Sequence, residues 1–236
     1  LYKVKPGVVV LPELMNTGYN LTSKDEVRYL SEIPKTGKTS LLLTQISSDI
    51  KSTIVAGFIE KSKNNFYNSA MIVSKGKFLG VYRKTHLFYN EKRFFSKGNT
   101  GFRVFSIDNF KLGVMICSDW MWPESARTLS LKGADLIAHP ANLILKEMCQ
   151  KTMPVRCFEN KVFAITANRI GSENRGKDHF IYTGKSQIVG PDMSVLARAS
   201  SSRNSVCSVS VDLSLARNKK LHKKNNILKD RRPDLY

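Results

Sequence analysis

Three reactive side chains stand at the ends of three separate apolar, strand-like runs of the chain. They are Glu13, Lys84 and Cys117, which end the runs at residues 8–13, 77–84 and 112–117. Catalytic groups are commonly held at strand ends, because a rigid sheet fixes their positions there. A carboxylate, an ammonium and a thiol that meet at such a place form an activated nucleophile.

Cys117 is the candidate nucleophile. It follows an apolar run and precedes a helix that we expect to begin near Pro123. The helix dipole and the free N–H groups at this turn would favour a thiolate. The nearest of them, the N–H of Ser118, would also stabilise an oxyanion. The alternative is a small buried hydrophobic residue, and we interpret the other cysteines, Cys149, Cys157 and Cys207, in that way.

Glu13 and Lys84 would supply a base and a positive charge. Glu13 is a candidate general base, with a pKa that burial would raise and a nearby ammonium would lower. Lys84 would stabilise the charge of a tetrahedral intermediate and favour the thiolate of Cys117. Each residue also has a plainer interpretation, since Glu13 can be the first residue of a loop and Lys84 can end a solvated hairpin.

A cysteine–histidine pair is the rival arrangement, because imidazole commonly activates a thiol. His86 and His139 are the available partners for Cys117. His139 falls near the end of a predicted buried strand, where a hydrogen-bonded core histidine is the commoner role. The sequence contains no G-x-S-x-G nucleophile elbow, no P-loop and no G-x-G-x-x-G motif.

The elements that must position these groups alternate between strand-like and helix-like patterns. Residues 16–33 are polar and predict a surface loop. Helices are predicted at residues 38–51, 123–132 and 153–160. Strands are predicted at residues 8–11, 53–60, 66–74, 77–84, 103–108, 111–117, 134–139, 162–168, 185–189, 194–199 and 205–213, with a hairpin turn at Lys75-Gly76. A helix-tending, then loose tail follows. Alternating strands and helices mixed with hairpins indicate one α/β domain with mixed sheets.

Composition narrows the function classes. The chain has 236 residues, enough for one domain with a sizeable core. Its net charge of +19 is spread along the chain without a nucleic-acid motif, so we expect no specific nucleic-acid partner. No apolar run is long enough to span a bilayer, and we expect no membrane association. Four cysteines without a C-x-x-C pair favour a cytoplasmic protein.

Several motifs of the chain resemble those of the nitrilase superfamily of carbon–nitrogen hydrolases. The motifs are residues 9–14, 82–88, 113–120, 122–127, 139–143, 156–160 and 166–169. The tail, at residues 215–220 and 229–232, is similar to that of archaeal nitrilases and related amidohydrolases. The resemblance covers nearly the whole chain, so we expect residues 1–236 to form a single carbon–nitrogen hydrolase domain.

The resemblance implies a role for each residue that matches the family motifs. Cys117 matches the nucleophile, Glu13 the general base, Lys84 the transition-state stabiliser and Glu91 a second glutamate that orients groups or shuttles protons. The family fold is a four-layer αββα sandwich with two mixed sheets. Family members pair through helices into homodimers or larger homo-oligomers, and they use no metal or organic cofactor.

Two departures from the family pattern are visible. The strand and long helix that normally precede the motif at residues 9–14 are missing from the sequence. Either the sequence is truncated, or the chain lacks an edge strand and a covering helix; truncation would expose apolar sheet surface. In addition, Ser118 stands where the family frequently has an aromatic residue, which changes the pocket wall beside Cys117.

The sequence therefore predicts a cysteine hydrolase of non-peptide carbon–nitrogen bonds. A small nitrile or amide would lose ammonia and pass through a thioester to a carboxylic acid. Phe88, Ser118, Trp120 and Met121 are the predicted pocket residues, with Trp122 nearby. The alternatives are an N-carbamoyl amino acid or amine amidohydrolase with the same machinery, and a non-catalytic binding module of the same fold.

Overall fold

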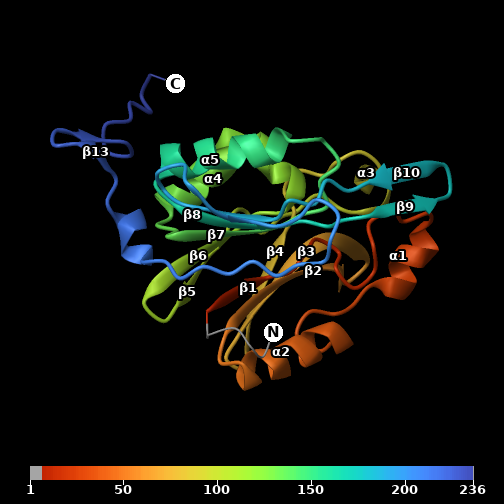
Figure 1. Ribbon diagram of the computed structural model, residues 1–236. Helices are drawn as coiled ribbons and strands as arrows, with labels where there is room; N and C mark the ends of the chain where they lie inside the picture. The colour runs from red at the N-terminus through yellow and green to blue at the C-terminus, as the bar shows by residue number, and fades with distance from the viewer. Residues whose placement is uncertain (1–6, 236) are drawn as a thin grey trace.

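The chain folds into two mixed sheets that lie face to face, with helices on both outer sides (Figure 1). This architecture comes from a computed structural model, which describes residues 7–235. The predicted four-layer αββα sandwich is confirmed. We expected no helix or strand before the first strand of the chain. This expectation concerns residues 1–6, which lie outside the described part of the chain.

The first sheet has the strand order β1-β2-β3-β4. Its strands are β1 (Val8–Val10), β2 (Thr53–Ser62), β3 (Asn65–Ser74) and β4 (Lys77–Arg83). β1 runs parallel to β2, and the other pairs are antiparallel. Lys75 and Gly76 both have a positive φ (48° and 79°), as a tight two-residue hairpin turn between right-twisted strands requires. The hairpin predicted at these residues is therefore confirmed.

The second sheet has the strand order β12-β11-β8-β7-β6-β5. Its strands are β5 (Val104–Ile107), β6 (Phe110–Val114), β7 (Leu136–Pro140), β8 (Phe163–Ala167), β11 (Gln187–Val189) and β12 (Val195–Arg198). The central strands β6, β7 and β8 are parallel, as expected where helices connect successive strands. They are covered on both faces, which explains their nearly continuous apolar sequences.

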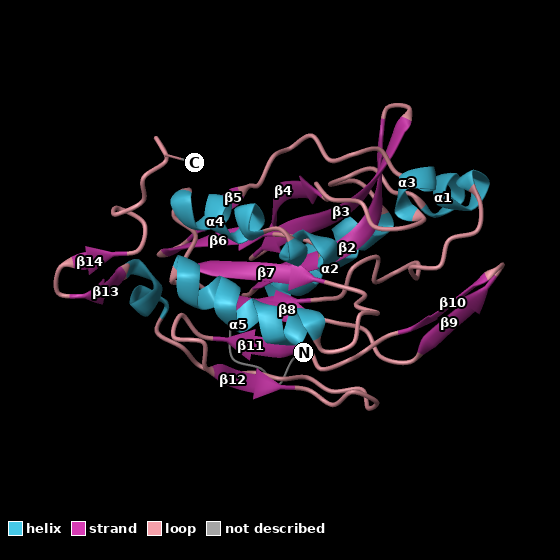
Figure 2. Cartoon of the chain, turned by 90° about the horizontal axis from the view of Figure 1, so that it is seen from above, coloured by secondary structure: helices cyan, strands magenta, loops and turns pink. Residues whose placement is uncertain are grey.

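Helices cover the outer face of each sheet (Figures 1 and 2). α2 (Lys38–Asp49) packs on the first sheet, with Leu43 and Ile46 against the cluster around Phe58. α4 (Pro123–Leu131) and α5 (Met148–Asn160) lie over the second sheet. All three helices were predicted, although α5 begins five residues earlier than residue 153, where its predicted start lay.

The main core lies between the sheets and joins them. Val55, Ile72 and Tyr82 from the first sheet belong to the same buried cluster as Val114 and Ile137 from the second. All five side chains are fully buried. Because tightly packed interiors resist relative motion, this core fixes the strand ends of one sheet against those of the other.

The surface loop predicted at residues 16–33 is wrong. This segment contains α1 (Lys24–Leu30), whose N-cap Ser23 accepts a hydrogen bond from the Glu26 N–H. It also buries Tyr19 and Val27 in a small satellite core. A seven-residue helix with a single buried side chain is too short to show a helical period in the sequence.

Three further differences lie in the second half of the chain. Residues 205–210 are irregular, and only the 3-10 turn η2 (Leu213–Arg217) follows, so the strand predicted at 205–213 is wrong. The tail then forms the small hairpin of β13 (Lys220–His222) and β14 (Asn225–Asn226) rather than a helix. The hairpin of β9 (Ser172–Arg175) and β10 (Asp178–Ile181) was not predicted, because its mostly exposed polar residues show no apolar alternation.

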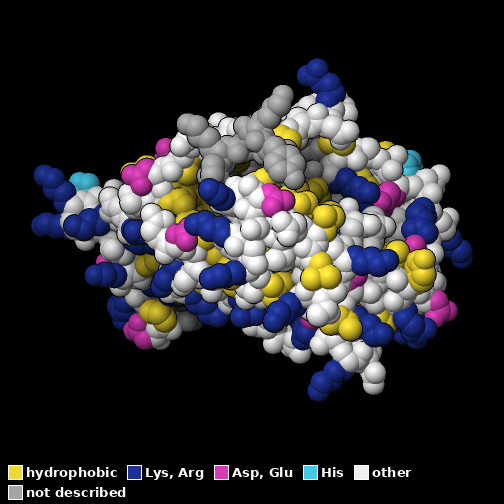
Figure 3. Space-filling model, turned by 90° about the horizontal axis from the view of Figure 1, so that it is seen from below, with side chains coloured by type: hydrophobic (Ala, Val, Ile, Leu, Met, Phe, Trp, Pro, Cys, Tyr) yellow, Lys and Arg dark blue, Asp and Glu magenta, His cyan; other side chains and the backbone are white. Residues whose placement is uncertain are grey.

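The charged side chains follow the diffuse pattern seen in the sequence. Figure 3 shows lysine and arginine side chains scattered over the face that carries α2 instead of gathered in one patch. Within residues 7–235, no helix has the length and apolar character needed to cross a bilayer.

Candidate active site

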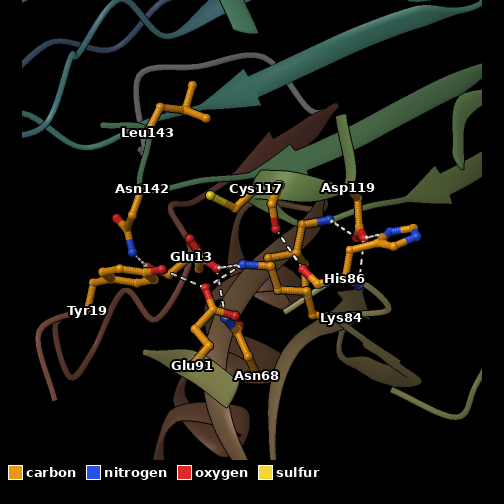
Figure 4. A network of polar contacts seen from close by, with 12 residues as sticks. Glu13, Tyr19, Asn68, Lys84, His86, Glu91, Cys117, Asp119, Asn142 and Leu143 are labelled. Atoms are coloured by element: carbon orange, nitrogen blue, oxygen red, sulfur yellow. Dashed lines mark hydrogen bonds and ion pairs between the residues drawn. The ribbon is translucent and has the colours of Figure 1, made fainter. Parts of the chain in front are cut away.

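The three segments singled out by their reactive side chains meet between the two sheets (Figure 4). Glu13 follows β1 and Lys84 follows β4 in the first sheet, whereas Cys117 opens the 3-10 turn η1 (Cys117–Met121) after β6 of the second. Glu13 and Lys84 are 0% exposed and Cys117 is 5% exposed. The structure thus brings these three groups together. In a non-catalytic binding module of the same fold, the three groups would lie apart or their pocket would be filled.

Lys84 is the centre of the polar network. Its Nζ lies 2.8 Å from Glu13 Oε1 and 2.6 Å from Glu91 Oε1. Glu91 opens the short helix α3 (Glu91–Phe94) and is 4% exposed. Burial by itself would lower the pKa of Lys84, but the two carboxylates outweigh burial and raise it, so the ammonium stays charged.

Asn68 and Tyr19 complete the network around the two carboxylates. Asn68, on β3, donates from Nδ2 to Glu13 Oε1 at 2.7 Å and to Glu91 Oε2 at 3.3 Å. The Tyr19 hydroxyl donates to Glu91 Oε1 at 2.7 Å. Glu13 Oε2, by contrast, is buried and has no hydrogen-bond partner among the described residues. One oxygen of Glu13 is therefore held, and the other is left to accept a proton.

Cys117 is held by its backbone. Its φ of +43° is unusual for a residue other than glycine and commonly marks a functional position. His139 Nε2 donates to the Cys117 carbonyl oxygen at 2.9 Å, while Thr166 Oγ1 lies 3.0 Å from His139 Nδ1. Burial lowers the pKa of His139 to about 4, so its ring is neutral. The predicted role of His139 as a hydrogen-bonded core histidine is confirmed.

The thiol of Cys117 is protonated in this environment. Burial raises its pKa well above the ordinary value, the charges of Glu13 and Glu91 add to the rise, and Lys84 and the Asn142 N–H oppose it. The expected thiolate is therefore wrong. α4 begins six residues after Cys117, too far for its dipole to dominate, and the carboxylates outweigh Lys84. The thiol needs a base before it can attack.

Both histidines that could pair with the Cys117 thiol have other partners, and the partner of His86 is Asp119. Its Oδ1 accepts a hydrogen bond from the His86 N–H and lies 2.7 Å from His86 Nδ1. Its Oδ2 accepts hydrogen bonds from the Tyr82 hydroxyl and the Ile116 N–H. The His86 ring also stacks on Trp122, with a centroid distance of 4.0 Å. His86 is thus engaged with Asp119, and His139 contacts the carbonyl of Cys117 instead of its thiol.

A pocket that is partly open to solvent lies beside the thiol. Besides Cys117 and Asn142, it is lined by Phe88, Ser118, Trp120, Met121, Leu143, Ile144 and Leu145. All four residues predicted from the sequence line it, whereas Trp122 stacks on His86 instead. Ser118 donates from Oγ to the His86 carbonyl oxygen at 2.6 Å. Apart from Cys117, Ser118 and Asn142, the lining is apolar, and it contains no charged side chain.

The model of the carbon-nitrogen hydrolase family matches residues 3–220 of this chain. This chain belongs to the carbon–nitrogen hydrolase family. Its relatives include a nitrilase of Pyrococcus abyssi, which is 48% identical over 97% of this chain and 86% of the relative. The chain is therefore a hydrolase of the nitrilase type.

Two further comparisons describe the breadth of the family. An N-carbamoylputrescine amidase of Arabidopsis thaliana is 30% identical over 98% of this hydrolase and 83% of the relative. The crystal structure of a carbon-nitrogen hydrolase from Helicobacter pylori G27 superposes with a TM-score of 0.86, at 27% identity, over 98% of this chain and 85% of that chain. The sandwich fold is thus shared with a solved member of the family.

Sequence reasoning missed Tyr19, Asn68 and Asn142. Asn142 donates from Nδ2 to the Glu13 carbonyl oxygen at 2.9 Å. It lies within the family motif at residues 139–143, to which the sequence analysis assigned no role. Asn68 carried only a weak signal, since it is a polar residue within a predicted strand that also contains Ser69 and Ser74. Tyr19 carried none, because its burial depends on the β9–β10 hairpin, which the sequence did not predict.

Gly57 sets the position of Glu13. Gly57 lies on β2, and its N–H donates to the Pro12 carbonyl oxygen at 3.1 Å while its own carbonyl accepts from the Met15 N–H at 2.9 Å. A Cβ at Gly57 would lie only 2.5 Å from the Cα of Glu13. The chain after β1 can therefore press against β2 only because this position lacks a side chain.

We expect Gly57→Ala to push the Glu13 backbone away from Lys84. Overpacking of this kind costs about 1–3 kcal/mol of stability, and a displacement of about 1 Å at a catalytic group lowers kcat about 100-fold. Ammonia release and thermal melting measure the two effects separately. Ala70→Gly, at the cross-strand partner of Gly57, is the control and should keep kcat. Unchanged turnover in Gly57→Ala would show that the position of Glu13 is not set here.

Proposed function

We propose that Glu13, Lys84, Cys117 and Glu91 are the catalytic residues of this hydrolase. The observation that carries the proposal is the single buried ammonium of Lys84, which pairs with both carboxylates beside the thiol. Glu13 is the base with a free oxygen, Cys117 is the nucleophile, and Lys84 is the fixed positive charge. This division of roles follows the environment of each group.

In the first half of the reaction, Glu13 Oε2 accepts the proton of the Cys117 thiol, and the sulfur attacks the carbon of a nitrile or an amide. Negative charge develops on the substrate nitrogen or oxygen. Lys84 Nζ and the N–H of Ser118, the second residue of the turn η1, would stabilise this charge. Such preorganised donors are most effective in a dry site, and Lys84 is completely buried.

In the second half, a thioester is hydrolysed. For an amide, the proton held by Glu13 passes to the departing nitrogen, ammonia leaves and the thioester remains. A nitrile first adds one water to reach the same tetrahedral stage. Water then attacks the thioester; Glu13, with help from the ionised form of Glu91, takes one proton from this water and passes it to the departing sulfur, so that the carboxylic acid and the free thiol are released.

The pocket favours an uncharged substrate. Phe88, Trp120 and Met121 contribute apolar walls, and no charged side chain is among the lining residues. A charged substrate group would lose its hydration there without gaining a partner. We therefore propose a small neutral nitrile or amide as the substrate, in keeping with the nitrilase relative from Pyrococcus abyssi.

An N-carbamoyl substrate is the second candidate, favoured by the N-carbamoylputrescine amidase relatives. N-carbamoylputrescine carries an ammonium, and an N-carbamoyl amino acid carries a carboxylate. Each would need an opposite charge in the pocket, and the lining residues offer none. The pocket therefore supports the neutral substrate over both carbamoyl compounds.

Replacement of the nucleophile tests the assigned roles. Cys117→Ala should abolish ammonia release while leaving the fold intact, because no other group there can form the thioester. Cys149→Ala is the matched control, since Cys149 is an equally buried thiol on α5. Intact-mass measurement during turnover should detect an acyl adduct on Cys117. Full turnover by Cys117→Ala, or an adduct on a different residue, would refute the proposal.

A substrate panel tests the pocket assignment. We expect kcat/KM for small neutral aliphatic nitriles or amides to exceed that for N-carbamoylputrescine and N-carbamoyl amino acids by at least about 100-fold, the discrimination expected from an uncompensated buried charge. Ammonia release at equal substrate concentrations measures the ratio. Preference for a charged carbamoyl compound would contradict the neutral assignment and leave the catalytic roles in place.

We propose that the chain acts as a single domain and pairs with a second copy through α4 and α5. Leu131 on α4 and Met148 and Val155 on α5 are apolar, and each is at least 40% exposed. We propose that these side chains contribute to one contiguous apolar surface, since such a surface commonly marks an interface. The thiol nucleophile also favours a reducing, cytoplasmic setting.

Charge reversal of the apolar face tests the pairing. Val155→Glu should yield a monomer in sedimentation velocity experiments, because a buried unpaired carboxylate opposes association. Leu42→Glu, on the outer face of α2, should leave the assembly unchanged. A wild-type monomer at micromolar concentration would contradict the proposed dimer.

A further inference from the structure

Tyr19 lies where the polar network meets the β9–β10 hairpin. Its hydroxyl donates to Glu91 Oε1 at 2.7 Å, on the same oxygen that Lys84 Nζ contacts (Figure 4). Its ring packs edge-on against Phe180 of β10, with a centroid distance of 5.6 Å. Tyr19 does not line the pocket beside Cys117. Its hydroxyl therefore contacts the proposed catalytic carboxylate of Glu91.

Glu173 of β9 fixes the backbone that carries Tyr19. Its Oε2 accepts hydrogen bonds from the Tyr19 N–H at 3.0 Å and from the Asn20 N–H at 2.7 Å. The same carboxylate is held by the Tyr182 hydroxyl at 2.7 Å and by Arg169 Nη1 at 2.6 Å. The contacts of Glu173 with Tyr19 and Asn20 join segments about 150 residues apart in the sequence. One anchored carboxylate thus determines where the Tyr19 hydroxyl lies.

We propose that Tyr19 is a positioning residue that holds the Glu91 carboxylate ionised and directed at Lys84, and that Glu173 acts through Tyr19. The proposal rests on the role of Glu91 in the proposed function. The hairpin thereby contributes to catalysis without contacting the substrate. Tyr19 and Glu173 form a chain of two hydrogen-bonding steps from the hairpin to the catalytic centre.

The charges around Glu91 explain why a single hydroxyl matters. Burial is the largest influence on Glu91 and raises its pKa, the charge of Lys84 lowers it, the charge of Glu13 raises it, and the Tyr19 hydrogen bond lowers it; the balance of these effects is a pKa raised to about 7. Cys117 and Asn68 are the remaining groups that face it from the packed elements. A hydrogen bond to an ionised carboxylate favours the ionised form. Glu91 therefore titrates near neutral pH, where the loss of one donor changes its charge.

Tyr19 remains a donor throughout this range. Burial and the charges of Glu91 and Glu13 raise its pKa well above the ordinary value, so its hydroxyl keeps its proton. The sign of the effect follows: without the Tyr19 hydroxyl, Glu91 holds its proton to a higher pH. Because the proposed reaction uses ionised Glu91, the rising limb of kcat against pH must then move upward.

Tyr19→Phe tests the proposal, because it keeps the ring against Phe180 and removes the hydroxyl. We expect the rising limb of kcat to shift upward by about one pH unit. Ammonia release at pH 6 should fall about tenfold, and at pH 9 it should match that of the wild type. KM should stay within about twofold. Tyr89→Phe is the matched control. Tyr89 lies two residues from Glu91 in the sequence, but its hydroxyl donates to Asp178, so the rising limb of this variant should not move.

Glu173→Ala tests the second step. It should shift the limb in the same direction as Tyr19→Phe, and the double variant should shift it no further than Tyr19→Phe alone, because both changes act on one contact. Shifts that add would overturn the role of Glu173. Thermal melting of each variant identifies loss of fold, which lowers activity equally at every pH.

The outcomes separate this proposal from the catalytic assignment. An unshifted limb in Tyr19→Phe, a uniform loss at all pH values in folded protein, or a wild-type profile without a rising limb would overturn the role of Tyr19. Turnover by Cys117→Ala would instead overturn the catalytic assignment on which it rests. A shifted limb with unchanged KM supports positioning and excludes a packing role alone.

Discussion

The site depends on one buried ammonium held between two buried carboxylates. Removing Lys84 from this arrangement would leave Glu13 and Glu91 close together with no counter-charge, a costly state in a dry interior. The ammonium therefore has a structural role as well as the proposed catalytic one. It also explains why the thiol rests in its protonated form, since two nearby carboxylates and burial outweigh one cation. A base with an unpaired oxygen, Glu13, lies where that proton must go.

The sandwich supplies the geometry that this ion cluster requires. One sheet carries Glu13 and Lys84 and the other carries Cys117, so the distance between base and nucleophile is set by how the sheets pack. Asp119 strengthens this connection, because its carboxylate on η1 accepts a hydrogen bond from the Tyr82 hydroxyl on β4. Gly57 provides the close approach that brings the chain after β1 onto β2. The outer layer adds a third support, since Glu173 on the β9–β10 hairpin holds the segment of Tyr19.

Much of the fold was predictable because its central strands and helices have strong patterns. The parallel strands β6, β7 and β8 are buried on both faces, and their apolar runs were unmistakable. The prediction failed where polar contacts made over long sequence separations stabilise an element. α1 and the β9–β10 hairpin are of this kind, joined by the ion pair between Arg175 and Glu26. Residues 205–213 failed for the opposite reason, since they alternate like a strand but find no partner strand.

The sequence by itself determined the family, the layered fold and the reactive residues, because side-chain type and spacing are local properties of the chain. Tertiary structure alone decided the protonation of Cys117, the exclusion of His86 and His139 as bases, and the roles of Asn68 and Tyr19 around the carboxylates. It also decided that the pocket beside the thiol lacks charged side chains. The physical reason is that burial and electrostatic coupling depend on which groups from distant segments become neighbours, and only folding makes them so.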